Sequence, residues 1–383
     1  MMRGFGMDNN YIEFYGKNRI SPVNQDISDI EKHYRRRQKL YRMCGIPTFA
    51  FKGSEMLEIG PGGGHNALAP IHWGIGHIDM VEANPYGVEK IRSLYSEKEI
   101  PEDVYTVFNM KVEEFTPQKQ YDLVVAEGFL GYVPNAREIC LKLQDFTKTG
   151  GVVVITCSDD TCIFIELMKR LVGIYVTRDI EGLENKVNAL IPVFKPQLEK
   201  LRGVSRPAKD WIEDNIFNPA FSNGCEFSVG DALEVFSDFD LLGSSPHIFT
   251  NYSWYKDIWY DELKSYKEQF WQKRMSFIMA GSEEEKLDGE LSRRLVKLFS
   301  DAKKLENEYE ISFDEKVIKS LLELLRSSVE DVKCLGDRFV KIYDQIISVL
   351  TSLTQGRQPD MENYPEFFGA FGRGLQYMSF MKR

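Results

Sequence analysis

The stretch that most constrains the fold is residues 56–69, which read MLEIGPGGGHNALA. It begins as a short apolar strand, passes through a glycine-rich turn and continues as the start of a helix. Because glycine has no Cβ, Gly60, Gly62 and Gly64 can adopt positive φ and let the backbone approach a ligand closely. The first N–H groups of the helix present a positive dipole end to the same ligand. Glu58, just before the turn, favours a cationic or amino-bearing ligand over a bare phosphate.

The composition of the chain excludes several classes of partner. At 383 residues the chain exceeds one average domain, and its net charge of −10 disfavours a DNA groove, which requires a basic surface. The six cysteines lack the spacing of a zinc site, so no metal is expected. No apolar run approaches the length of a membrane span, and the first ten residues lack the core of a signal peptide. We therefore expect a cytoplasmic protein without a DNA partner.

Strand-like and helix-like segments alternate between residues 55 and 157. The predicted strands are 56–59, 78–82, 104–108, 123–126 and 152–157, and the predicted helices lie near 65–73, 86–96 and 135–147. This alternation predicts an α/β fold with a doubly wound, mostly parallel sheet and right-handed crossovers. The carboxyl ends of the parallel strands then share one edge, where a ligand is expected.

The rest of the chain is predicted to surround this core. We expect an N-terminal helical cap at 1–50, the core at 51–160, a helical insertion or lid at 161–228, the last strands at 229–260, and a helical region at 261–383. Within these regions, 238–243 and 248–250 are the candidates for the last strands. The apolar stripes of the C-terminal region are typical of a helical bundle core, and they are compatible with a homodimer.

A basic helix is predicted within the N-terminal cap and ends near Met43. Its side chains include Arg35, Arg36 and Arg37. Two interpretations stay open, a solvated helix face and a contact with a phosphate on a substrate.

Acidic and glycine-containing segments follow the first turn in the order that a nucleoside ligand needs. Glu82 ends the second strand, where a carboxylate can accept hydrogen bonds from both ribose hydroxyls. Residues 109–115 follow the third strand, 121–128 form the fourth strand and its exit, and Gly150 and Gly151 turn into the fifth.

Together, residues 55–157 resemble the class I S-adenosylmethionine-dependent methyltransferases. The matching segments are LEIGPGGG at 57–64, VEA at 81–83, YDLV at 121–124 and GGV at 150–152. The resemblance implies a seven-stranded Rossmann-like sheet with S-adenosylmethionine across its strand ends. It implies a cofactor site formed by Glu58, Gly60, Gly62, Gly64, Glu82, Ala83, Lys111, Val112 and Glu127.

One position departs from the pattern of this family. Many members carry an acidic residue after the third strand that receives the adenine amino group, whereas Lys111 and Val112 stand there. The adenine contact then comes from the backbone or from Glu113.

A nicotinamide-dependent dehydrogenase is the competing interpretation, because residues 62–67 fit G-x-G-x-x-A. It is disfavoured because the first glycine after the strand is Gly60, and because Glu58 would lie beside a pyrophosphate.

The candidate catalytic residues are Glu127, Tyr132 and His65, with Asp159, Asp160 and His247 as further acid–base candidates. The Asn/Asp-Pro-Pro-Tyr/Phe segment of many N-methyltransferases is replaced by AEGF at 126–129. We therefore expect methylation of a small-molecule or carbohydrate-linked acceptor at oxygen. The alternatives are a protein methyltransferase and a non-catalytic S-adenosylmethionine-binding assembly protein.

Overall fold

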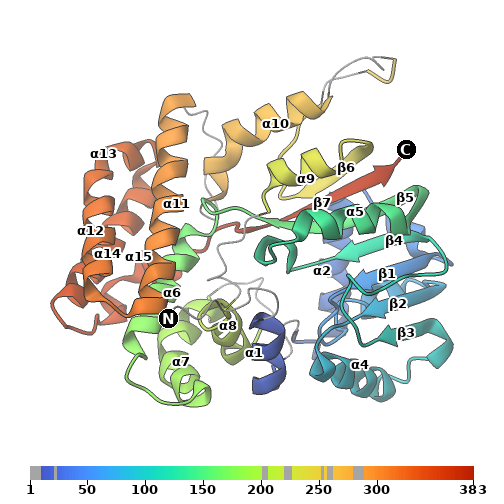
Figure 1. The fold of residues 1–383 in the computed structure, drawn as a ribbon, viewed down its shortest axis with the longest axis horizontal. Helices are drawn as coiled ribbons and strands as arrows, with labels where there is room; N and C mark the ends of the chain where they lie inside the picture. The colour runs from blue at the N-terminus through green and yellow to red at the C-terminus, as the bar shows by residue number, and fades with distance from the viewer. Residues whose placement is uncertain are drawn as a thin grey trace, which may run out of the picture. The chain divides into compact units, whose positions relative to one another are not determined.

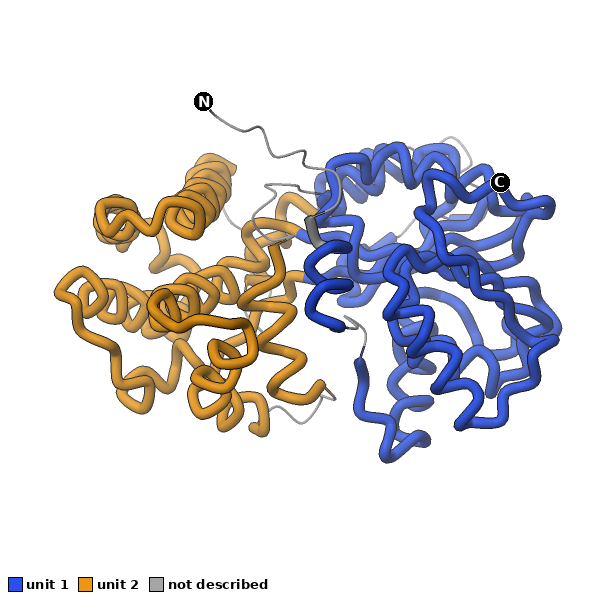
Figure 2. Tube along the Cα trace, turned by 60° about the horizontal axis from the view of Figure 1, so that its bottom comes forward, with its two compact units in different colours: residues 1–158, 225–269, 375–383 blue, residues 159–224, 270–374 orange. Residues whose placement is uncertain are grey.

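The computed structural model describes residues 10–20, 24–200, 206–219, 227–251, 254–256, 262–278 and 289–383. The chain divides into two compact units (Figure 2). The first, here called the sheet unit, comprises residues 1–158, 225–269 and 375–383. The second, the helical unit, comprises residues 159–224 and 270–374.

The sheet unit contains a seven-stranded sheet in the order β3-β2-β1-β4-β5-β7-β6 (Figure 1). The strands are β1 (Glu55–Ile59), β2 (His77–Val81), β3 (Tyr105–Phe108), β4 (Tyr121–Ala126), β5 (Thr147–Ser158), β6 (Phe239–Ser245) and β7 (Leu375–Lys382). Strands β1 to β5 run parallel, whereas β7 is antiparallel to both β5 and β6. The predicted α/β class with a mostly parallel, Rossmann-like sheet is confirmed.

The last two strands differ in part from the sequence prediction. Strand β6 corresponds to the predicted strand at 238–243, but residues 248–250 form no strand. Strand β7 comes instead from the end of the predicted helical region and inserts between β5 and β6. Its Met378 and Phe380 are buried and belong to the core. Proline lacks the N–H that a paired strand requires, which explains why the ladder ends there.

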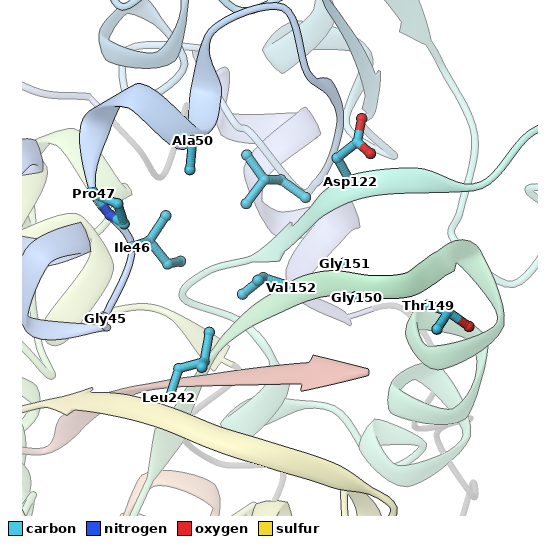
Figure 3. A pocket seen from close by; sticks show the side chains of 11 residues that line it. Gly45, Ile46, Pro47, Ala50, Asp122, Thr149, Gly150, Gly151, Val152 and Leu242 are labelled. Atoms are coloured by element: carbon cyan, nitrogen blue, oxygen red, sulfur yellow. The ribbon is translucent and has the colours of Figure 1, made fainter. Parts of the chain in front are cut away.

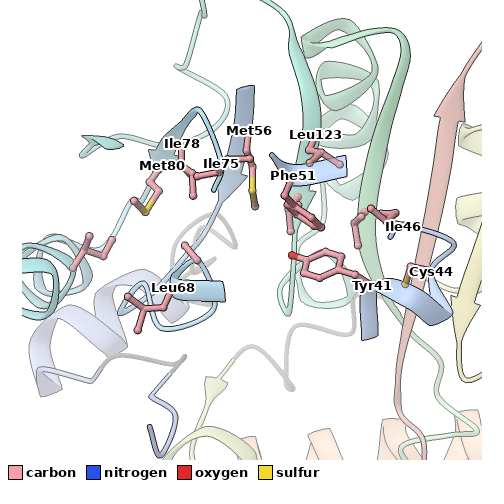
Figure 4. Packing of buried hydrophobic residues seen from close by; sticks show 14 of the residues in the cluster. Tyr41, Cys44, Ile46, Phe51, Met56, Leu68, Ile75, Ile78, Met80 and Leu123 are labelled. Atoms are coloured by element: carbon pink, nitrogen blue, oxygen red, sulfur yellow. The ribbon is translucent and has the colours of Figure 1, made fainter. Parts of the chain in front are cut away.

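Helices cover both faces of the sheet. On one face, α2 (Ile30–Met43), α3 (Leu68–His72) and α4 (Pro85–Glu97) pack against an apolar cluster (Figure 4). Strands β1, β2 and β4 contribute Met56, Ile78, Met80, Leu123 and Val125 to this cluster. In the sheet, β2 and β3 lie on one side of β1, and β4 and β5 lie on the other. Right-handed crossovers therefore place α5 (Ala136–Phe146) on the opposite face. Helix α9 (Val229–Val235) packs against β5 and β7.

The helical unit is built around α6 (Phe164–Val176), which is buried along most of its length. The other helices are α7 (Leu183–Glu199), α8 (Ala208–Asn215), α11 (Gly289–Ser312), α12 (Glu315–Ser327), α13 (Val329–Val332), α14 (Asp337–Thr354) and α15 (Pro365–Gly369). The structure also describes α1 (Asn10–Asn18), α10 (Glu262–Lys273), η1 (Thr48–Phe51), η2 (Glu102–Val104), η3 (Leu130–Tyr132), η5 (Arg274–Phe277), η6 (Lys333–Leu335) and η7 (Met361–Asn363). Among the helices of the described ranges, none is long and apolar enough to cross a membrane.

Candidate functional site

The glycine turn after β1 has the backbone geometry that only glycine adopts easily. Gly60, Gly62 and Gly64 have φ values of 68°, 59° and 75°. A Cβ on Gly64 would lie 3.0 Å from Ile91 and 3.2 Å from Tyr95, and one on Gly60 would lie 3.3 Å from the ring of Phe129. Both the dihedral angles and the close neighbours therefore require glycine at this turn.

The helix after the turn is shorter than predicted. The sequence predicted a helix near 65–73, but α3 starts only at Leu68, after three further turn residues. Pro70 explains the delay, because proline is tolerated in the first turn of a helix and disrupts its interior. The ligand-facing groups at this edge are therefore the turn amides and nearby side chains, rather than the amino end of a long helix.

Glu82 connects the end of β2 to the glycine turn. Its Oε2 accepts a hydrogen bond from the Gly62 N–H at 2.7 Å, and its Oε1 accepts one from the Asn84 N–H at 2.8 Å. Burial raises the pKa of Glu82 to about 7, although the two N–H donors act in the opposite direction. A carboxylate has about four lone-pair sites, so the two oxygens retain capacity for ribose hydroxyls.

Three glutamates end neighbouring strands on the same face of the sheet. Met56, Met80 and Val125 belong to the apolar cluster of that face. The residue two positions after each of these three is a glutamate, namely Glu58, Glu82 and Glu127. Side chains alternate along a strand, so this spacing directs all three carboxyl groups to the α2 face at the carboxyl edge. The middle strand places Glu58 opposite Met80 on β2 and Val125 on β4, which is why Glu58 lies deeper than the other two.

Helix α2 supplies the cation for this edge. Arg37 donates to Glu127 Oε1 at 2.5 Å and to Oε2 at 2.9 Å, and both side chains are largely buried. Arg37 also donates to the Tyr41 hydroxyl at 2.9 Å, while Asn66 donates to Glu127 at 3.3 Å. The interpretation of the basic helix as a wholly solvated face is wrong for Arg37, because this side chain is paired with Glu127. The two residues are 90 positions apart in the sequence, so a local pattern cannot reveal the pair.

Glu58 differs from the other two glutamates because its Oε2 is buried without a hydrogen-bond partner. The side chain is only 4% exposed. Burial raises the pKa of Glu58 to about 8, Glu127 and Glu82 raise it as well, and Arg37 lowers it. Burial therefore favours the neutral form of this carboxyl group.

His33 is a second residue of α2 that the sequence reasoning left without a role. It is buried, and its Nε2 lies 3.0 Å from the backbone oxygen of His65, next to the glycine turn. Burial and the nearby Arg37 lower the pKa of His33 to about 4, so the ring is neutral and Nε2–H donates to that oxygen. The spacing of His33, Arg37 and Tyr41 on one helix face was the signal that could have found this cluster.

The other predicted cofactor and catalytic residues lie around the same edge. Tyr132 is half-buried in η3, where the neighbouring Gly131 packs so closely that a Cβ would lie 2.4 Å from Ser158. Val112 is buried and Lys111 is half-buried in the turn after β3, and Ala83 is half-buried after β2. The adenine contact through the backbone of this turn or through Glu113 stays a prediction. Glu113 accepts a hydrogen bond from Asn135 at 2.7 Å.

The structure does not support the three further acid–base candidates. Asp159 and Asp160 lie in the helical unit, where they form buried ion pairs of 2.5 Å with Arg274 and Lys303. His247 is exposed after β6. Paired carboxylates and an exposed ring lack the activation that proton transfer requires.

A pocket of about 290 Å³ lies at the other end of the strands (Figure 3). Asp122 at the start of β4 and Gly150, Gly151 and Val152 on β5 line it, together with residues after α2. This is the amino end of both strands, whereas a doubly wound sheet binds its ligand at the carboxyl ends. We therefore do not assign the cofactor to this pocket.

Part of the chain is similar to known methyltransferases. Residues 32–199 match a family model described as a methyltransferase domain. Similar solved structures include the N-methyltransferase NodS from Bradyrhizobium japonicum with S-adenosyl-L-homocysteine, at 18% identity over 40% of this chain and 75% of that one (TM-score 0.31). They also include an S-adenosylmethionine-dependent methyltransferase from Mesorhizobium loti, at 16% identity over 31% of this chain and 52% of that one (TM-score 0.28). The match therefore spans about half of the second protein. No curated protein matches the chain.

The family match and the sheet identify residues 32–199 as a methyltransferase domain of class I, which confirms the resemblance seen in the sequence.

Proposed function

We propose that the chain is an S-adenosylmethionine-dependent methyltransferase that acts on a small-molecule or carbohydrate-linked acceptor. The observation that carries this proposal is the glycine turn at the junction of β1 and β4, held by the Glu82 carboxylate through the Gly62 N–H. This junction is the point where the strand order reverses, and doubly wound sheets bind their ligands there.

The residues present fit this cofactor. The glycine turn excludes side chains from the backbone surface, and Glu82 retains acceptor capacity for a ribose. The unpartnered Glu58 oxygen suits a positive charge, which the sulfonium and ammonium groups of S-adenosylmethionine provide. When bound, this cofactor supplies an electrophilic methyl group for in-line displacement. The chain supplies position and exclusion of water.

The arrangement changes the role we propose for Glu127. Both of its oxygens accept hydrogen bonds from Arg37, so its lone pairs are largely committed to the ion pair. We infer that Glu127 positions the edge of the site by fixing α2 to the end of β4. Tyr132 and His65 remain the proposed catalytic candidates, and they act by contacting the acceptor or taking its proton.

The finer assignments are also proposals. The assignment of oxygen as the acceptor atom depends on the AEGF segment at 126–129. The division into five domains and the cytoplasmic location are inferred from the sequence pattern alone. Dimerisation through the C-terminal helices is a prediction that sedimentation analysis of the purified chain can check.

Transfer from methyl-labelled S-adenosylmethionine tests the proposed activity. The purified chain is incubated with a fractionated metabolite extract and, separately, with a protein extract. We expect label in the small-molecule fractions and, after chemical degradation, a methyl ether. Label confined to protein would indicate a protein methyltransferase, and binding without transfer would indicate an assembly protein. Either of these outcomes would contradict the proposed acceptor class.

A further inference from the structure

We propose that the outward face of α2 binds the surface of an anionic lipid bilayer. This face consists of four cationic side chains, here called the basic stripe, namely Lys32, Arg35, Lys39 and Arg42. The basic stripe lies on the side of α2 that faces away from the proposed cofactor site. The proposal therefore stands whether or not the chain transfers methyl groups.

Helical spacing places the four cations in a single row. They follow one another at intervals of three, four and three residues, and residues at these intervals lie on one side of a helix. All four are exposed, whereas His33, Arg37 and Tyr41 occupy the buried side of α2. At a rise of about 1.5 Å per residue, the row extends over about 15 Å. Helix α2 therefore has one face packed on the sheet unit and one face made only of positive charge.

The protein does not use the charge of the basic stripe internally. Among the residues that the structure describes, none forms an ion pair with these four side chains. Glu31 is the single acidic residue of α2, although the whole chain has a net charge of −10. A concentrated positive field on an otherwise acidic protein orients this face toward an anionic surface.

The chemistry of the basic stripe favours a lipid surface over other anionic partners. The core of a protein interface is depleted of charged residues and contains apolar anchors, and the basic stripe provides no such anchor. A nucleic acid is held in a basic groove with stacking aromatic rings, which the net charge of the chain disfavours. A bilayer requires neither a pocket nor a groove. Groups of about four to eight Lys and Arg residues on one helix face are typical of binding to anionic headgroups.

An exposed aromatic residue next to α2 provides a second signal for a lipid surface. Phe49 belongs to η1, which follows α2 and packs against it, and its side chain is 79% exposed. Charge attraction alone gives weak, reversible binding, and an apolar group that enters the boundary between headgroups and acyl chains strengthens it. We assign this second role to Phe49.

Docking of this face would bring the proposed cofactor site close to the bilayer. The opposite side of α2 carries Arg37, which is paired with Glu127 at the carboxyl edge of the sheet. A helix with its side chains is about 10–12 Å across. The carboxyl edge would therefore lie about one helix diameter from the headgroups.

Cosedimentation of the full chain with vesicles tests the proposal. Anionic vesicles contain phosphatidylglycerol and phosphatidylcholine, and neutral vesicles contain phosphatidylcholine alone. We expect binding to the anionic vesicles only, and release as salt rises, because the Debye length falls from about 10 Å at 0.1 M to about 3 Å at 1 M. No binding to anionic vesicles, or equal binding to both kinds, would overturn the proposal.

Two double variants with the same net charge separate the basic stripe from a general charge effect. Lys32→Ala/Lys39→Ala removes two lysines of the basic stripe, and Lys316→Ala/Lys319→Ala removes two exposed lysines of α12. Each cation near an anionic surface contributes about fivefold to binding, so we expect the first variant to bind about 25-fold more weakly. The second should bind as the wild type does. Equal losses in the two variants would contradict a specific role of the basic stripe.

A further pair of variants distinguishes lipid from other polyanions. Phe49→Ala should weaken vesicle binding by about fivefold or more, because part of an apolar side chain no longer leaves water. Ile311→Ala is the control, since Ile311 is 77% exposed in the helical unit. Unchanged binding by Phe49→Ala, or tighter binding of the wild type to a single-stranded oligonucleotide or to polyglutamate, would reject a lipid partner.

Calorimetry with S-adenosylmethionine keeps this proposal separate from the proposed function. We expect Lys32→Ala/Lys39→Ala to bind the cofactor with wild-type affinity after it has lost vesicle binding. Cofactor binding without vesicle binding in the wild type would overturn the inference alone. Vesicle binding without cofactor binding would overturn the proposed function and leave the inference standing.

Discussion

The sheet unit and the helical unit both bury charged groups, but they balance them differently. In the described part of the helical unit, buried acids face buried cations in the pairs Asp159–Arg274, Asp160–Lys303 and Glu306–Arg170. At the carboxyl edge of the sheet, Arg37 pairs with Glu127 and acts on Glu58, backbone N–H groups hold Glu82, and Glu58 Oε2 has no hydrogen-bond partner. Buried pairs can be explained by structure alone, whereas an uncompensated cluster at a strand edge indicates a place for a ligand charge.

The largest effect that tests this contrast is expected in the helical unit. Arg170→Ala leaves Glu306 buried without its cation and removes the donor to the Ile216 oxygen. Breaking a buried pair from one side costs about 3–5 kcal/mol. We expect a loss of that size in urea unfolding, with S-adenosylmethionine affinity of the folded protein unchanged. The exposed Lys297→Ala substitution is the control. A selective loss of ligand affinity without lost stability would contradict a purely structural role.

The second test breaks the ion pair of the sheet unit. Arg37→Ala leaves Glu127 half-buried without its bidentate partner and loosens α2 from the end of β4. We expect a loss of about 2–4 kcal/mol in stability, together with weaker cofactor binding, because the same edge is the proposed cofactor site. Arg35, exposed on the same helix, is the matched control, and Arg35→Ala should change stability by less than about 0.5 kcal/mol. Equal effects of the two substitutions would remove the assigned role of Arg37.

The third test is the pH dependence of stability. Folding raises the pKa of Glu58 to about 8, so the folded state binds more protons than the unfolded state between roughly pH 4.5 and 8. The contribution of this bound proton to folding stability is complete at low pH, and it is lost as pH rises through the pKa of Glu58 in the folded state. In Glu58→Gln we expect this fall to be smaller by up to about 5 kcal/mol in denaturant unfolding across that range. An unchanged pH profile in the variant would show that Glu58 does not hold the proton.

Sequence pattern located the sheet edge because the relevant signals are local. The glycine turn, and Glu82 at the end of its strand, follow from backbone rules that act over a few residues. Even the shared face of Glu58, Glu82 and Glu127 is implicit in strand alternation. The sequence therefore contained the acids of the site in readable form.

The remaining parts depend on contacts between distant segments. Arg37 meets Glu127 across 90 residues, and although Arg37 shares a helix face with His33 and Tyr41, no local pattern identifies Glu127 as its partner. Strand β7 returns to the sheet only after the chain has passed through the helical unit. The short glycine-containing stretch before β7 also interrupts the alternating apolar pattern of a strand. In this stretch the Gly372 N–H donates a hydrogen bond to the Glu166 carboxylate at 2.7 Å. The Arg37–Glu127 pair and the position of β7 depend on contacts between segments that are distant in the sequence, and local propensity does not predict them.

The most direct test of the central claim is the affinity of the chain for S-adenosylmethionine, measured by calorimetry before and after Glu82→Ala. The substitution removes the acceptor of the Gly62 and Asn84 N–H groups and the proposed acceptor of the ribose. We expect measurable binding by the wild type, a loss of about 1–3 kcal/mol in the variant, and wild-type affinity in the exposed Glu114→Ala control. No affinity in the wild type, or equal affinity in the wild type and Glu82→Ala, would contradict the assignment of this edge as the cofactor site.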